Sequence, residues 1–211
     1  MQLTKTTSWG FIIGGLWASI GMLAFFFGIL GVSDDMEPAE EFKKLQDNQE
    51  MALVFFIISV GVFGYLTKSF VQLSEAVNVI AEWHTYVRIM AIIMVGSLLV
   101  SMSTWLIHGP DATLETQQAS DAVGNSVNSL FIIASAFVQL IIAWFALKNG
   151  LGNQIFKVFV GIIGVLSVLD LVNMVVDGAG SESDLAFITW IGWAIAVVGI
   201  GVLGLVTKED A

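Results

Sequence analysis

The stretch QIFKVFVGIIGVLSVLDLVNMVV, residues 154–176, decides the fold class of this 211-residue chain. It holds only two charged side chains, Lys157 near its start and Asp170 far inside it. A helix that crosses the roughly 30 Å hydrocarbon core of a bilayer needs about 20 mostly apolar residues. The stretch therefore predicts a membrane-spanning helix that carries a carboxylate at depth.

Five further apolar stretches occur along the chain. The chain is 56% hydrophobic and 12% charged, whereas a soluble domain is about 45–50% apolar and about 25% charged. We therefore expect an all-α fold, a single polytopic integral membrane domain over residues 1–211 built as a six-helix transmembrane bundle. The expected spanning helices are 9–32, 51–67, 86–108, 126–147, 154–176 and 186–206.

Charged residues are sorted between the loops. Lys and Arg favour the cytoplasmic side of a membrane. If the N- and C-termini are cytoplasmic, the inner segments hold six of the eight basic residues and the outer loops hold only Lys43 and Lys44. We predict a multi-pass protein of the cell membrane with acidic loops, above all 33–50, on the outer, non-cytoplasmic side. A net charge of −10, concentrated outside, repels DNA, so no nucleic-acid partner is expected.

Two features favour assembly with other subunits. Residues 68–85 have apolar side chains at three- and four-residue spacing, which predicts an amphipathic helix at the inner interface or an extension of the second spanning helix. Glycines recur in the first, second and sixth spanning helices, where small residues let helix backbones approach in lipid. Helix packing is the expected role of these glycines. Besides the lipid bilayer, we predict a homo- or hetero-oligomer formed through these glycine-rich helices and the amphipathic helix.

Polar residues follow one face of each of helices three to five, at helical spacing. Polar groups that face lipid are costly, so these faces should meet protein or water. Asp170 is the exceptional position, because a carboxylate there costs about 2.5–3.5 kcal/mol even on a lenient insertion scale and such groups commonly mark an ion, proton or ligand path. The alternative is a protonated or Asn-paired residue that locks helix five to a neighbour. We predict an ion or ligand pocket that opens outward, with candidate residues Ser101, Thr104, His108, Asn125, Asn128, Gln139, Asp170, Asn173 and Asp177.

Cofactor chemistry has little support in the sequence. There is no Cys, and the two histidines, His84 and His108, lie roughly 36 Å apart along a continuous helix, too far to ligate one haem within a monomer. His108, Asp111 and Asp177 form a weak candidate metal site at the outer surface. No phosphate-binding or hydrolase motif occurs, so the sequence implies no cofactor and no enzyme.

Three hypotheses of function remain. The first is a non-catalytic structural or accessory subunit of a membrane assembly, because catalytic motifs are lacking and several helices are apolar and glycine-rich. The second is a small cation or proton channel or transporter that uses Asp170 and the polar faces. The third is a metal- or cofactor-binding membrane protein with His108 as a ligand.

Overall fold

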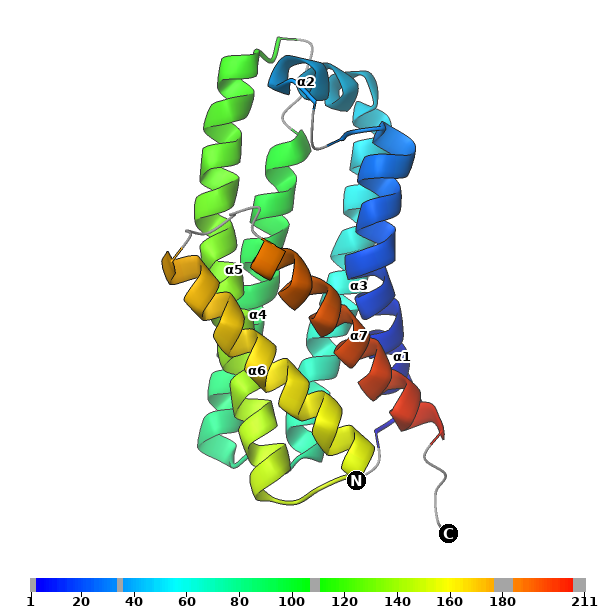
Figure 1. Ribbon diagram of the computed structural model, residues 1–211, viewed down its shortest axis with the longest axis vertical. Helices are drawn as coiled ribbons and strands as arrows, with labels where there is room; N and C mark the ends of the chain where they lie inside the picture. The colour runs from blue at the N-terminus through cyan, green and yellow to red at the C-terminus, as the bar shows by residue number, and fades with distance from the viewer. Residues whose placement is uncertain (1–2, 34–35, 107–110, 177–183, 207–211) are drawn as a thin grey trace.

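The computed structural model describes residues 3–33, 36–106, 111–176 and 184–206, apart from the side chain of Trp105. These residues form helices and no strand. Figure 1 shows the helices as a tall bundle. The helices are α1 (Lys5–Leu16), two π-helical segments (Trp17–Gly21 and Ala24–Leu30), α2 (Pro38–Asp47), α3 (Gln49–Ala76), α4 (Ala81–Ser103), a 3₁₀ turn (Thr104–Leu106), α5 (Leu114–Lys148), α6 (Gln154–Val176) and α7 (Asp184–Val206).

The expected class of all-α membrane protein is confirmed. Helices α3 to α7 are each long and apolar enough to cross a membrane, which makes five among the described residues. The first stretch makes a sixth if its two parts, Lys5–Gly21 and Ala24–Leu30, count as one span bent by 41°. The expected uninterrupted helix over 9–32 is therefore wrong in detail. Ser19 contributes to the departure, because its Oγ lies 2.7 Å from the Gly15 carbonyl, a local contact that commonly bends helices.

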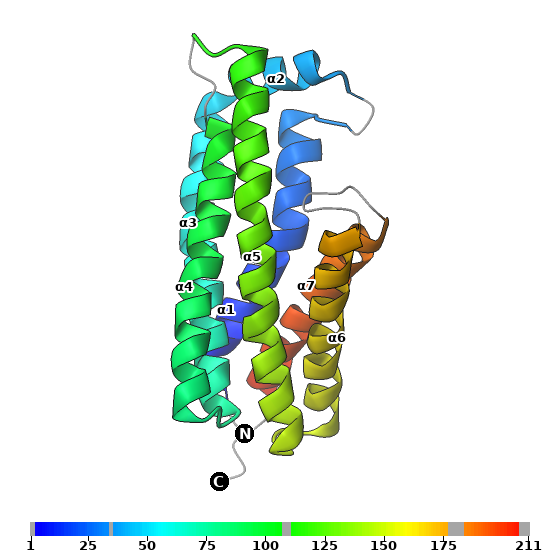
Figure 2. The same cartoon turned by 90° about the vertical axis from the view of Figure 1, so that its left-hand side faces the viewer.

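The bent first stretch and helices α3 to α7 form a closed ring in chain order. Each helix packs against its neighbours in the chain, and α7 packs back against α1, as the two views in Figures 1 and 2 show. The helix α5 has 35 residues, roughly 52 Å at 1.5 Å per residue, and so is longer than the hydrocarbon core. Helices α6 and α7 have 23 residues each and lie tilted, and Figure 1 shows that their upper ends stop well below that of α5.

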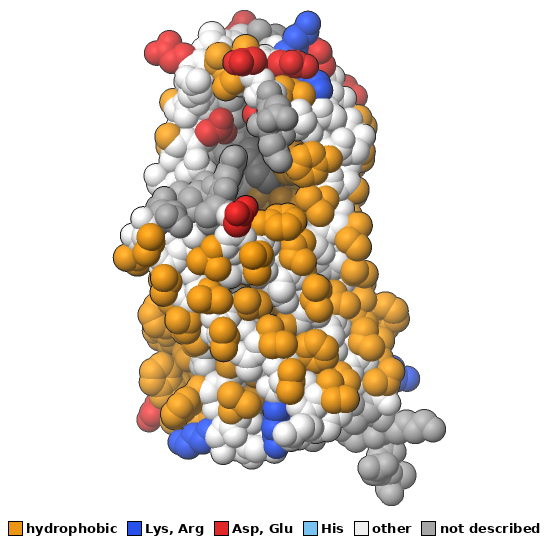
Figure 3. All heavy atoms as spheres, in the orientation of Figure 1, with side chains coloured by type: hydrophobic (Ala, Val, Ile, Leu, Met, Phe, Trp, Pro, Cys, Tyr) orange, Lys and Arg blue, Asp and Glu red, His pale blue; other side chains and the backbone are white. Residues whose placement is uncertain are grey.

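The two ends of the bundle differ in charge. We call the end that carries α2 and the starts of α3 and α5 the acidic end, because Glu40, Glu41, Asp47, Glu50 and Glu115 lie there. Figure 3 shows acidic side chains gathered at this end and a broad hydrophobic belt below it. The opposite end holds the start of α1, the end of α7 and the turns α3–α4 and α5–α6 (Figure 2).

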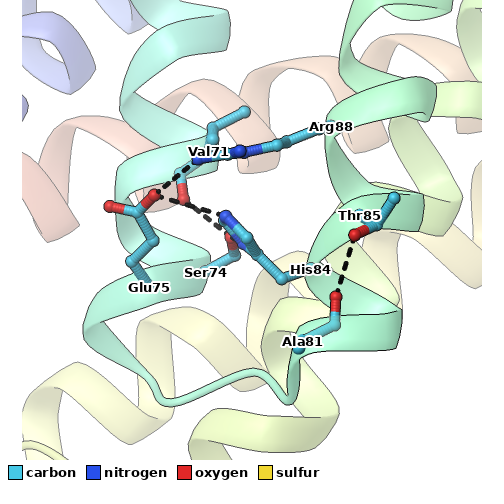
Figure 4. A network of polar contacts seen from close by, with 7 residues as sticks. All are labelled: Val71, Ser74, Glu75, Ala81, His84, Thr85 and Arg88. Carbon is cyan, nitrogen blue, oxygen red and sulfur yellow. Dashed lines mark hydrogen bonds and ion pairs between the residues drawn. The ribbon is translucent and has the colours of Figure 1, made fainter.

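The α3–α4 turn corrects the expected amphipathic helix at 68–85. Its first half extends α3, as one of the two expectations had it, but the helix ends at Ala76 and Asn78 takes a left-handed φ of 57°. Figure 4 shows what joins the two helices: the Glu75 carboxylate lies 3.2 Å from the Arg88 guanidinium and 3.3 Å from His84 Nε2. His84 therefore lies on α4, and its side chain contacts α3 across the turn between the two helices.

The helix α5 begins twelve residues before the expected boundary at 126. Thr113 caps it, because the Thr113 hydroxyl accepts from the Thr116 N–H and the Thr116 hydroxyl accepts from the Thr113 N–H. Residues 114–125 are mostly polar and continue the helix outside the apolar stretch. Because the boundary at 126 was predicted from apolar residues alone, it came too late in the chain. In the loop 33–50, Pro38 and the residues after it predict a short helix, and the structure has this helix as α2, with Pro38 in its first turn.

The glycines of α1 and α7 pack inside the chain. A Cβ on Gly14 would lie 2.7 Å from Leu66 of α3, and one on Gly201 would lie 2.6 Å from the Ser8 carbonyl of α1. In α3, by contrast, a Cβ on Gly61 or Gly64 would meet nothing within 4 Å. The close approach expected of small residues thus occurs at the α1–α3 and α1–α7 contacts of the ring.

Candidate functional site

A cavity of about 310 Å³ lies within the ring of helices. The bent first stretch and all five helices α3 to α7 contribute to its wall, which includes Ala18 from the first π-helical segment and Met22 directly after that segment. Residues of the first stretch and of α7 lie side by side in this wall, so the cavity depends on the closure of the ring between them. Its polar lining residues are Thr67, Asn128, Ser135, Gln139, Asp170, Asn173 and Thr189.

Asp170 is the one ionisable residue among the described residues that line this cavity. It lies on α6 six residues before Val176, about 9 Å from the end of the helix. The Thr189 side chain of α7 is its hydrogen-bond partner, and the Thr189 hydroxyl also lies 3.0 Å from the Ala186 carbonyl. The carboxylate is thus placed between α6 and α7, with Asn173 buried one turn further along α6.

Gln139 lines the cavity, and its contact with Ser167 behind the wall joins α5 to α6. The Ser167 Oγ lies 3.0 Å from Gln139 Oε1 and 2.8 Å from the Ile163 carbonyl, so its single proton is shared between two acceptors. Both side chains are buried. The contact fixes the amide of Gln139 at the level where the cavity ends.

Aromatic rings make up much of the remaining wall. Two are tryptophans of α7: the Trp190 indole N–H donates to the Ala18 carbonyl at 2.9 Å, whereas the buried Trp193 indole nitrogen has no hydrogen-bond partner among the described residues. The Trp190 bond ties α7 to the π-helical segment of the first span and fixes the indole plane. The aromatic lining residues are Phe63, Phe70, Phe131, Trp190 and Trp193.

A second cavity, which we call the vestibule, lies at the acidic end. It has a volume of about 520 Å³ and is enclosed by α2, α4, α5 and the end of the first span. Two carboxylates, Glu41 and Asp121, line it. Met22, Leu98 and Asn128 line both the vestibule and the central cavity, so the two spaces meet at these three side chains.

The structure divides the sequence-derived candidates between two levels. Asn128, Gln139, Asp170 and Asn173 line the central cavity. Three others, Ser101, Thr104 and Asn125, line the vestibule together with Asn128. The structure therefore places the candidate residues of α4, α5 and α6 around two neighbouring cavities, and Ser101 and Thr104 lie beside the vestibule and not beside Asp170.

The candidate metal site cannot be assembled from the described residues. His108 and Asp177 lie outside them, and Asp111 is an exposed residue in the turn before α5. Within the part of the chain that the structure describes, no group of three or more His, Cys, Asp or Glu side chains is arranged to hold a metal ion.

Sequence reasoning missed the aromatic half of the site. Helices α3 and α7 were expected only to pack, yet they supply Phe63, Phe70, Trp190 and Trp193 to the cavity wall. A signal was present, because residues 186, 189, 190 and 193 share one face of a helix. That face combines small, hydroxyl and indole side chains, a composition that is more typical of a cavity lining than of a surface in contact with lipid.

Comparison with known proteins gave no match: no family model, no curated protein and no solved structure matches the chain.

Proposed function

We propose that this chain is an integral membrane protein that admits a cation at its acidic end and binds it at Asp170, as the outward-facing step of cation transport. The observation that carries the proposal is the central cavity, which the bent first stretch and helices α3 to α7 line and which has a carboxylate in its wall. Carboxylates within membrane segments commonly belong to ion, proton or ligand paths. The position between α6 and α7, with a hydroxyl partner and an open space in front, fits a binding group better than a lock between helices.

The vestibule supplies a route to the carboxylate. Its described lining residues include Glu41 and Asp121 and no Lys, Arg or His. A cleft lined by one sign of charge and low-dielectric walls raises the local concentration of counter-ions. A cation that enters between α2 and α5 therefore moves towards a second, deeper negative group at Asp170.

The cavity ends before the opposite end of the bundle. Its lining stops at the level of Phe70 and Gln139. Phe11 of α1 packs edge to face on Phe70, and Leu73, one turn further along α3, is fully buried. A conducting channel needs a continuous path, whereas a carrier in its outward-facing state is open at one end only. The one-sided cavity supports a carrier.

The charge distribution supports the orientation. Of the described basic residues, Lys5, Lys68, Arg88, Lys148 and Lys157 lie towards the end opposite α2. Because basic residues favour the cytoplasmic side, that end is the cytoplasmic one in our proposal, and the vestibule opens to the outside.

Charge displacement in proteoliposomes tests the proposal. Protein reconstituted on a solid-supported membrane is exposed in turn to Na⁺, K⁺ and tetramethylammonium salts, and the transient current is recorded. We expect at least one cation to give a current that Asp170→Asn abolishes and Asp47→Asn leaves unchanged, since Asp47 is exposed on α2 and lines neither cavity. If the current of Asp170→Asn equals that of the wild type, Asp170 does not bind the cation.

A second candidate is a subunit of a membrane assembly. Gly61 and Gly64 of α3 favour it, because both are exposed and open space lies where their side chains would be, which leaves α3 free to approach another helix. Purification in mild detergent distinguishes the candidates: a stable partner or sister subunit supports assembly, and a lone monomer that binds cations speaks against it.

A further inference from the structure

We infer that the cation bound at Asp170 is a hydrophobic organic monocation, such as a protonated or quaternary amine, and not a small inorganic ion. The inference rests on the proposed function and names its ligand class. Its basis is the composition of the cavity wall, in which one carboxylate lies among mainly apolar and aromatic side chains.

The aromatic side chains suit an ammonium group with an apolar body. A cation over the face of an aromatic ring is attracted by the ring quadrupole, and Trp is the best partner. Two of the five aromatic lining residues are Trp190 and Trp193, both on α7. The same helix carries Thr189, the partner of Asp170, so the indoles lie within one helical turn of the carboxylate's partner.

Near the carboxylate, the described wall has two polar side chains, Thr189 and Asn173, which are too few to complete the ligand shell of a small ion. An ion such as Ca²⁺ gathers 6–8 oxygen ligands at about 2.3–2.6 Å. In this cavity Asn128 and Gln139 are separated by eleven residues of α5, roughly 16 Å along the helix. They cannot meet on one ion together with Asp170. An extended organic ligand can contact the carboxylate with its charged group and an amide with another part.

A pair of probes that differ only in charge tests the inference. Benzyltrimethylammonium carries a quaternary nitrogen, and neopentylbenzene has the same shape with a carbon in its place. Binding of each to protein in nanodiscs is measured by calorimetry at fixed pH, with empty nanodiscs as the control for partition into lipid. Na⁺ and K⁺ are titrated in parallel.

We expect the charged probe to bind at least about tenfold more tightly than the neutral one, because only the charged probe gains from the carboxylate and the indoles. Asp170→Asn should remove this preference. The substitution Trp193→Leu should weaken the charged probe by about tenfold and leave the neutral probe unchanged, whereas Trp193→Phe, which keeps a ring, should weaken it less. Thermal melting of each variant confirms that the fold is retained.

The contrary outcomes separate the inference from the proposed function. Equal binding of the two probes overturns the inference. If Na⁺ or K⁺ binds in an Asp170-dependent way and benzyltrimethylammonium does not, the proposed function stands and the inference falls. If no cation of either class binds, both are wrong.

Discussion

Closure of the ring between α1 and α7 depends on Gly201. An alanine Cβ at this position would lie 2.6 Å from the Ser8 carbonyl oxygen, 2.7 Å from Ile12 Cγ1 and 3.0 Å from the Ile12 nitrogen. Two of these three atoms belong to the backbone of α1, so no side-chain rotation can relieve the clash. To restore an ordinary contact of 3.4 Å, the two helices must separate by about 0.8 Å at this point.

The cost follows from comparison with Gly61. Gly61→Ala places a methyl group in open space and gains about 0.8–1.0 kcal/mol of helix propensity. Gly201→Ala gains the same propensity but also overpacks the contact, at about 1–3 kcal/mol. The difference between the two variants is therefore about 1–3 kcal/mol, or about 2–12 °C in melting temperature at about 2–4 °C per kcal/mol for a chain of this size.

The measurement is a thermal melt of both variants and the wild type in one detergent, followed by intrinsic fluorescence. We expect Gly201→Ala to melt below the wild type or at its temperature, and Gly61→Ala at or above it. If Gly201→Ala melts as high as Gly61→Ala, α7 does not pack on α1 through this glycine, and the closed ring on which the central cavity depends is wrong.

Three further predictions test the cavity and the orientation. Trp190→Phe should lower the melting temperature by about 2–4 °C, because it removes a hydrogen bond to the Ala18 carbonyl worth about 1 kcal/mol; a loss near zero would mean that water replaces it. Leu98→Trp should slow the charge displacement without lowering the melting temperature, because Leu98 lies where the vestibule meets the central cavity; unchanged kinetics would place the entry route elsewhere. The chain has no Cys, so single cysteines report orientation: in intact cells an impermeant thiol reagent should label Asp47→Cys and not Gln154→Cys, and the opposite result would invert the topology.

The class of fold follows from the sequence because it depends on length and composition alone. The bilayer requires about 20 apolar residues per span, and α6 coincides with the expected stretch at 154–176. Boundaries that depend on hydrogen bonds were less predictable. The capping box at Thr113 extends α5 far beyond its apolar part, and the turn at Asn78 divides the expected helix at 68–85.

The polar half of the candidate site was accessible from the sequence, since Asp170 is conspicuous in an apolar stretch and helical spacing groups its neighbours. The aromatic half was harder to predict, although residues 186, 189, 190 and 193 share one face of a helix. A tryptophan in a spanning helix commonly lies at the membrane interface, and only the tertiary structure shows that Trp190 instead faces inwards and donates to the Ala18 carbonyl. Which face of α7 meets the cavity depends on the closure against α1, a contact between the two ends of the chain.

The closure of the ring between α1 and α7 also limits which helices could contact another subunit. The expectation of an oligomer relied on glycines in three helices and on an amphipathic helix at 68–85, which the turn at Asn78 divides. Of the glycines, Gly14 and Gly201 are occupied by contacts between helices of one chain. They cannot also hold a second subunit without opening the ring. Among the glycine-rich helices, α3 is therefore the one that could still pack against another subunit, because Gly61 and Gly64 face open space. A subunit docked there would cover the outside of the ring, opposite the face of α3 that carries Phe63 to the cavity. Assembly and cation binding would then use different faces of one helix, so an oligomer, if found, would leave the central cavity accessible from the vestibule.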